Sequence, residues 1–183
     1  PEIGNPNIKQ PVSNHYTFGF KGEFLDNWSW QVDSYYKTFD RLPTALPQQQ
    51  DPDDKYYVAQ TSGDAKGVEL LLNRDRADNW YGWMSLSYSR SERTNNLTGQ
   101  TSDYRLDTPV VFNMVGNYQF HSGWQLGFRF IAKSGEAYTQ VVGIQPNPYF
   151  EDKYIGIYGE PYAKRLPTYA RLDFRATKPF SMF

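Results

Sequence analysis

The sequence of 183 residues has no cysteine, two histidines and no long apolar run. Without cysteine there is no disulfide scaffold and no thiolate chemistry. A transmembrane helix needs about 18 consecutive apolar residues, and no segment approaches that length. The net charge of −1 gives no basic footprint for nucleic acid. No glycine-rich phosphate loop follows a strand and opens a helix, so nucleotide chemistry has no support either.

Aromatic residues, by contrast, are abundant. They make up 17% of the chain, with 15 Tyr, 12 Phe and 5 Trp, although the mean hydropathy is only −0.73. A chain this polar can cross a bilayer only as a closed β-barrel, in which every backbone polar group pairs with a neighbouring strand.

Apolar and polar residues alternate along seven segments. Phe18 and Phe20, for example, are interleaved with Gly19 and Lys21. A period of two predicts strands with one apolar and one solvated face. The predicted strands are 16–24, 28–37, 67–73, 80–89, 111–120, 124–133 and 170–177. The apolar residues that break the alternation are Leu71, Tyr81, Trp83, Val111 and Val115.

The connections between these segments alternate between short and long. The short ones, 26–27, 76–79 and 121–123, contain the Asp, Asn, Ser and Gly that favour tight turns. The long ones are 40–64, 90–109 and 134–167. Structureless loops of that length argue against a compact soluble domain, whereas short periplasmic turns and long extracellular loops are typical of outer-membrane barrels. Trp28, Trp80 and Trp124 follow the short turns, where a periplasmic aromatic girdle is expected.

Charged residues occupy the parity opposite the aromatic side chains. Leaving so many ions unpaired in a dry interior would cost several kcal/mol each, so we expect a wide, wet lumen or a polar plug. The residues predicted to face the lumen are Lys21, Glu23, Asp33, Lys37, Glu69, Arg129, Lys133, Arg171, Asp173 and Arg175.

Several short motifs resemble the barrel of the TonB-dependent outer-membrane receptors, in the order and at the spacing of that family. They are residues 5–9 (NPNIK), 35–37 (YYK), 62–70 (SGDAKGVEL), 87–89 (SYS), 106–109 (LDTP), 134–139 (SGEAYT) and 165–175 (RLPTYARLDFR). Gln10 departs from the Glu or Pro that often follows the first motif. Each motif is weak alone, and together they favour the family without indicating a substrate.

The resemblance implies an all-β, antiparallel transmembrane barrel of about 22 strands with a plugged lumen. Residues 1–183 would supply about seven strands of its C-terminal portion, with the plug domain and the final strands absent. Pro179 would interrupt a terminal strand ending at Phe183. The implied function is active uptake of a scarce ligand, such as a ferric siderophore, haem, a cobalamin or an oligosaccharide, across the bacterial outer membrane.

The partners implied by the resemblance are the rest of the same receptor, the TonB-ExbB-ExbD complex, outer-membrane lipid and the ligand. No cofactor, metal or catalytic residue is expected. Aromatic faces can stack on sugars or catecholates, and arginine can pair with carboxylates. The ligand-contact candidates in the extracellular loops are Tyr104, Arg105, Tyr149, Phe150, Tyr154, Tyr158 and Tyr162. Alternatively, these tyrosines pack the loop and extend the outer girdle.

Other polar groups suggest weaker hypotheses. His15 could ligate haem or be a solvated histidine at a strand end, and it should lie on the rim opposite His121. His121 beside Ser122 fits a turn better than a nucleophile and its base. The run 51–54 offers carboxylates to a hard cation but reads more simply as a solvated loop tip, as does 151–152.

Two other protein classes remain open. An outer-membrane barrel enzyme, such as a phospholipase, would share the alternation but needs a Ser-His pair on the lipid face, and no predicted strand supplies the histidine. A soluble, sugar-binding β-sandwich would share the aromatic richness, yet it should have loops of mixed length at both ends.

Overall fold

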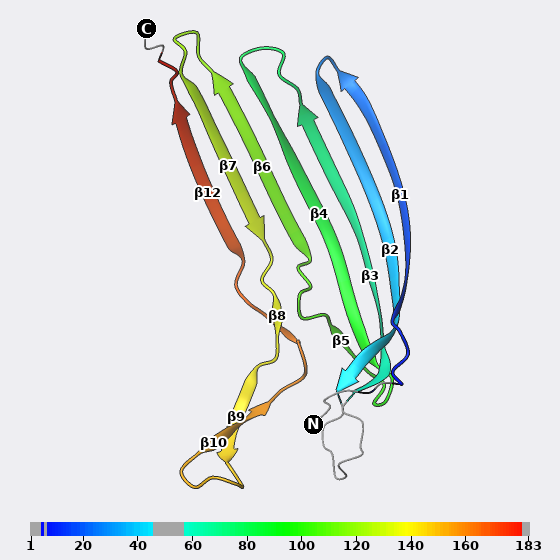
Figure 1. Ribbon diagram of the computed structural model, residues 1–183. Coiled ribbons are helices and arrows are strands. Elements are labelled where there is room, and N and C mark those ends of the chain that lie inside the picture. Colours follow the sequence, from blue (N-terminus) through cyan, green and yellow to red (C-terminus); the bar gives the residue numbers. More distant parts are fainter. Residues whose placement is uncertain (1–4, 6, 46–56, 181–183) are drawn as a thin grey trace.

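The computed structural model describes residues 5, 7–45 and 57–180, and it contains one large antiparallel sheet (Figure 1). The seven predicted strands are all present. They run in the spatial order β1-β2-β3-β4-β6-β7-β12, so that each of the first four pairs with its neighbour in sequence. Their bounds are β1 Val12–Leu25, β2 Trp28–Ala45, β3 Tyr57–Arg74, β4 Trp80–Asn95, β6 Val110–Gln119, β7 Gln125–Lys133 and β12 Tyr169–Thr177.

The three predicted tight turns lie together at one end of the sheet (Figure 1). Asn27 adopts the left-handed conformation, with φ 66°, in the two-residue turn between β1 and β2. Gly123 has φ 84° in the β6–β7 turn, where the Phe120 N–H donates to the Trp124 carbonyl at 2.8 Å. Asparagine and glycine tolerate positive φ at low cost, which explains their positions here.

Three strands extend well beyond their predicted ends into the long connections. β2 and β3 have 18 residues each and β4 has 16, whereas about ten residues suffice to cross a bilayer. The β2–β3 register shifts between Phe39 and Leu42, and Arg41 there has φ 58°. Such a bulge adds one unpaired residue and bends the strand. Pairing continues beyond it, although the sequence there no longer alternates between apolar and polar residues.

The remaining long connections also contain short strands. β5 Gln100–Asp103 folds back on the end of β4. Between β7 and β12, β8 Ala137–Tyr138 pairs with β11 Lys164–Arg165. Beyond that pair, β9 Val141–Pro146 and β10 Tyr154–Tyr158 form a hairpin (Figure 1). The regions expected as irregular loops are therefore partly ordered by local pairing.

The strand register sorts the side chains into two faces. One row across all seven strands is entirely apolar: Phe20, Val32, Leu70, Leu86, Phe112, Ala132 and Ala170. The adjacent row is Lys21, Gln31, Leu71, Ser85, Asn113, Ile131 and Arg171. We call the first side the apolar face and the second the polar face. Leu71, Tyr81, Trp83, Val111 and Val115 all fall on the polar face.

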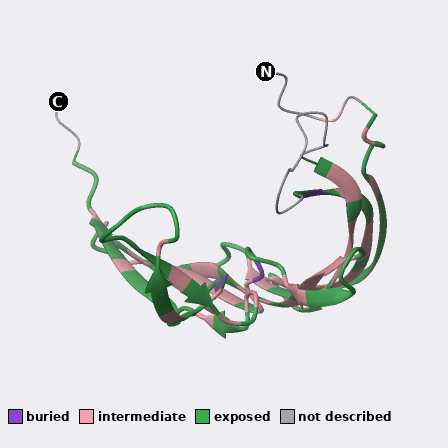
Figure 2. Ribbon diagram, turned by 90° about the horizontal axis from the view of Figure 1, so that it is seen from below, coloured by how far each residue is buried: buried purple, intermediate pink, exposed green. Residues whose placement is uncertain are grey.

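The curved sheet has no packed core (Figure 2). Among the described residues, Ala137 is the only buried apolar side chain. Phe18 and Phe174 on the apolar face are 64% and 78% exposed. In water such an open apolar surface would be costly, so this face requires an apolar environment. In the part of the chain that is described, no helix has the length and apolar character to span a membrane.

Candidate ligand-contact region and its polar support

Four of the predicted ligand-contact aromatics are exposed on the β9–β10 hairpin. Tyr154 and Tyr158 belong to β10, at 66% and 67% exposure, and Tyr149 and Phe150 lie in the connecting turn. The Tyr149 N–H donates to Asn147 Oδ1 at 2.9 Å, which orders the turn. These rings therefore present open faces at the end of the sheet opposite the tight turns (Figure 1).

The other three candidates lie elsewhere. Tyr162 is half-buried at the base of the hairpin, with φ 54°, and its N–H donates to Thr139 Oγ1 at 3.0 Å. Tyr104 and Arg105 follow β5, and Arg105 is exposed. The Tyr104 ring stacks on Arg93, whose guanidinium carbon lies 4.3 Å from the ring centroid. The structure thus brings four of the seven candidates together and gives Tyr104 a different partner.

Arg93 is the centre of a cation–π stack on the polar face of the long strands. Its guanidinium lies between Tyr104 and the ring of Phe39, 4.4 Å from the latter centroid. Phe39, Gly63 and Arg93 form one row across β2, β3 and β4. A side chain at Gly63 would collide with Arg93 Cδ and Nη1, at 2.7 and 2.9 Å from the added Cβ. Glycine is therefore needed for the arginine to reach Phe39.

Burial lowers the pKa of the Arg93 guanidinium below its ordinary value, while Coulombic interaction with Asp64, and with Tyr104 in its ionised form, opposes this shift. The guanidinium also donates to Ser91 Oγ at 3.0 Å. Arginine remains protonated throughout the physiological range, so Arg93 supplies a fixed positive charge beneath Tyr104.

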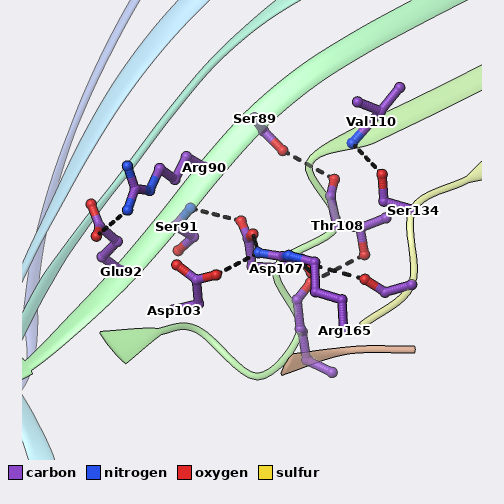
Figure 3. Close-up of polar contacts among 12 residues, drawn as sticks. Ser89, Arg90, Ser91, Glu92, Asp103, Asp107, Thr108, Val110, Ser134 and Arg165 are labelled. Atoms are coloured by element: carbon purple, nitrogen blue, oxygen red, sulfur yellow. Dashed lines mark hydrogen bonds and ion pairs between the residues drawn. The ribbon is translucent and has the colours of Figure 1, made fainter. Parts of the chain in front are cut away.

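Arg165 ties two long connections to the end of β4 (Figure 3). Its Nη2 donates to Asp103 Oδ2 and to Asp107 Oδ2, both at 2.6 Å. Its Nη1 donates to the Asp107 carbonyl at 2.9 Å. The Asp107 side chain is 1% exposed, and its Oδ1 accepts from the Ser91 N–H at 2.7 Å. Because a buried carboxylate needs a charged or hydrogen-bonded partner, Arg165 and Asp107 stabilise the base of the hairpin.

The sequence alone indicates no role for Arg165, Asp107 or Arg93. Arg165 and Asp107 do belong to the motifs 165–175 and 106–109, and Gly63 belongs to 62–70. Their position within these family-like motifs is the one sequence feature that points to Arg165, Asp107 and Gly63. What it could not indicate is that residues 58 positions apart in sequence form one ion pair.

The ten charged residues predicted to face the lumen all fall on the polar face by register. In the strand register, Asp33 lies opposite Glu69 on β2 and β3. Arg129 lies opposite Asp173 on β7 and β12. Arg171 Nη2 also lies 2.8 Å from Asp173 Oδ1. Both signs therefore occur along this face, within hydrogen-bonding distance of one another in places.

The minor candidates are separated. His15 lies near the long-connection end of β1, where it shares a hydrogen bond of 2.9 Å with Thr17. His121 lies in the β6–β7 turn at the opposite end, so the two histidines do fall on opposite rims. Residues 51–54 lie outside the described residues. Across the ranges that are described, no group of three potential metal ligands comes together.

Comparison with known families agrees with this geometry. The family described as "TonB dependent receptor-like, beta-barrel" matches residues 1–182. The chain belongs to the TonB-dependent receptors. It is therefore part of an outer-membrane receptor barrel, and the phospholipase and β-sandwich alternatives are not supported.

No curated protein matches the chain. Among solved structures, this receptor barrel is similar to the FrpB iron transporter from Neisseria meningitidis (F3-3 variant), with a TM-score of 0.67 and 12% sequence identity. The match covers 96% of the present chain and 25% of FrpB. At this identity the likeness concerns the fold alone, and the chain spans about a quarter of that transporter's length.

Proposed function

We propose that the chain is the C-terminal portion of the barrel of a receptor that imports a scarce, iron-carrying ligand. The observation that carries this proposal is the exposed aromatic hairpin, β9–β10, held at the extracellular end by Arg165. The rest of the same receptor would supply the plug and the remaining strands of a barrel of about 22. The TonB-ExbB-ExbD complex would supply the energy to displace the plug.

A ferric siderophore is the ligand class that best fits these residues. Tyr154 and Tyr158 expose ring faces on which catecholate groups can stack. Arg105 offers a guanidinium for the negative charge of such complexes. The structurally similar FrpB is an iron transporter, and this supports iron over haem, cobalamin or an oligosaccharide in the proposal.

The polar face would line a wet lumen that contains the plug. Lys21, Glu23 and Arg175 are exposed there, with no protein layer over them in the described structure. Ions of both signs on one concave wall suit a polar plug or water rather than a dry interior.

The test uses the intact receptor in outer membranes, a ferric tris-catecholate siderophore and the double variant Tyr154→Ala, Tyr158→Ala. Loss of two stacking faces should weaken binding about tenfold or more, measured by intrinsic fluorescence quenching. The matched variant Tyr154→Phe, Tyr158→Phe keeps both rings and should bind like wild type. Iron uptake should cease when TonB is absent.

The outcome is decisive in either direction. Unchanged siderophore binding by the alanine variant would show that Tyr154 and Tyr158 do not contact the ligand. Binding of haem, cobalamin or a glycan by wild type in place of the siderophore would replace the ligand class. Uptake that continues without TonB would overturn the transport proposal itself. Migration of unheated and heated samples on a detergent gel checks that each variant forms a barrel.

A further inference from the structure

The apolar face contains a groove near the tight-turn end that neither strand pairing nor ligand uptake explains. Its volume is about 530 Å³, and its lining is almost wholly apolar. It crosses β2, β3, β4, β6, β7 and β12, away from the β9–β10 hairpin.

One row of residues creates this groove. The row runs Trp28, Arg74, Gly82, Gly116, Phe128 and Phe174 across six strands. Its two central members lack side chains, whereas Met84 and Met114 lie beside them in the next apolar row. The two glycines thus lower the surface between large side chains, and the Phe128 ring leans over Gly116, where it would meet an added Cβ. A Cβ at Gly82 would also meet the Val115 carbonyl oxygen, so the hollow cannot easily be filled there.

Arg74 places a positive charge at the edge of this hollow. Its guanidinium carbon lies 4.1 Å from the Trp80 ring centroid and 5.6 Å from that of Trp28. The side chain is only 11% exposed, and its salt-bridge partner Asp78, at 3.1 Å, is 76% exposed. Within the described residues, Arg74 Nε has no hydrogen-bond partner. Asp78 accepts from Nη2, so the guanidinium between the two tryptophans keeps further donors for a second anion.

The depth of the site identifies the anion. Arg74 ends β3 beside the short turns, which are periplasmic in outer-membrane barrels, and Trp28 and Trp80 mark the level of the lipid headgroups. Phosphate is the anion of that layer, and arginine binds it through charge-assisted hydrogen bonds. The groove runs from this level along the hydrocarbon-facing surface.

We propose that the groove binds one phospholipid of the periplasmic leaflet, with its phosphate on Arg74 and an acyl chain over Gly82 and against the Phe128 ring. The headgroup pairs with the guanidinium between the tryptophans, and the chain fills the glycine hollow. The receptor thereby holds a specific lipid on the outside of its wall, at a site independent of the siderophore region.

The test is native mass spectrometry of the intact, delipidated receptor titrated with phosphatidylglycerol. Wild type should retain one lipid. Arg74→Gln removes the charge and Met114→Trp fills the hollow, and each should weaken retention about tenfold. Arg74→Lys keeps the charge and should retain more lipid than Arg74→Gln.

Two matched controls share the environment but not the groove. Lys178 is a second rim cation, 5.5 Å from the Trp124 ring centroid, and Leu70 lies further along the same face. Lys178→Gln and Leu70→Trp should retain the lipid like wild type. Equal retention by all variants would overturn the proposal, as would retention of diacylglycerol as strong as that of phosphatidylglycerol. If Arg74→Gln fails to form a barrel, Met114→Trp against Leu70→Trp still decides.

Discussion

Arg165 joins two of the long connections through Asp103 and Asp107. Arg165→Ala would leave the Asp107 carboxylate, 1% exposed, with the Ser91 N–H as its one remaining partner among the described residues. Removing one member of a buried ion pair costs several kcal/mol. Because Arg165 itself is 30% exposed, we expect a cost of about 2 to 3 kcal/mol. Hydrogen exchange of the Ser91 amide and of residues 134–167 measures it.

A similar ion pair provides the control. Lys133 Nζ lies 3.8 Å from Glu136 Oε1, with both side chains well exposed. Such surface pairs contribute little, so Glu136→Gln should leave hydrogen exchange unchanged. Equal protection in the Arg165→Ala receptor and wild type would show that Arg165 does not hold the connections.

Single substitutions also test which face meets lipid. Leu172 lies near the middle of β12 on the apolar face, beside Phe130. Leu172→Arg should destabilise the barrel by about 2 to 4 kcal/mol, because it puts a charge into hydrocarbon. Arg129→Ser, on the polar face, should be milder. Urea unfolding of the receptor in lipid vesicles compares them, and equal tolerance would contradict the assigned facing.

At the scale of elements, the β9–β10 hairpin is separable from the wall. β9 and β10 pair only with each other within the described structure, outside the large sheet. Replacing residues 141–159 by a short glycine-serine linker should therefore leave barrel formation intact and abolish siderophore binding. Heat-dependent gel migration and fluorescence quenching report these two effects separately. Loss of the barrel in this variant would mean that the hairpin is part of the folding unit.

The elements differ in how far the sequence predicts them. Alternation alone located the seven strands, because bilayer and lumen require different side chains on the two faces. Outside the bilayer that requirement ends. Residues 39–45 and 61–66 therefore show no alternation of apolar and polar residues, although their backbones still pair. The bulge at Arg41 disturbs the alternation further, because one extra residue exchanges the faces to which odd and even side chains point.

The site was predictable only as a set of residue types. Exposed loop aromatics can be chosen from composition, and four of them do share a hairpin. The Arg165–Asp107 pair and the Phe39–Gly63–Arg93 row depend on strand register, which motifs of a few residues do not specify. Tertiary placement therefore decided which candidates lie together.

On the scale of the whole molecule, the sheet has two open edges. Among the described strands, β1 and β12 each pair on one side only, and unpaired edges promote aggregation. Residues 1–183 expressed alone in detergent should therefore aggregate or remain partly unfolded, as measured by light scattering and circular dichroism. Supplying the remaining strands of the barrel should restore a discrete species. A monomeric, cooperatively unfolding fragment would contradict this expectation.

The alternation of apolar and polar side chains along each strand also affects how the protein is exported. Each apolar side chain is followed by one of the polar face, so the nascent chain never offers the inner-membrane translocon about 20 consecutive apolar residues. It can therefore pass through that channel without lateral release into the inner membrane. The apolar face becomes continuous only after the strands pair. The chain therefore gains affinity for a membrane only when the sheet forms at the outer membrane.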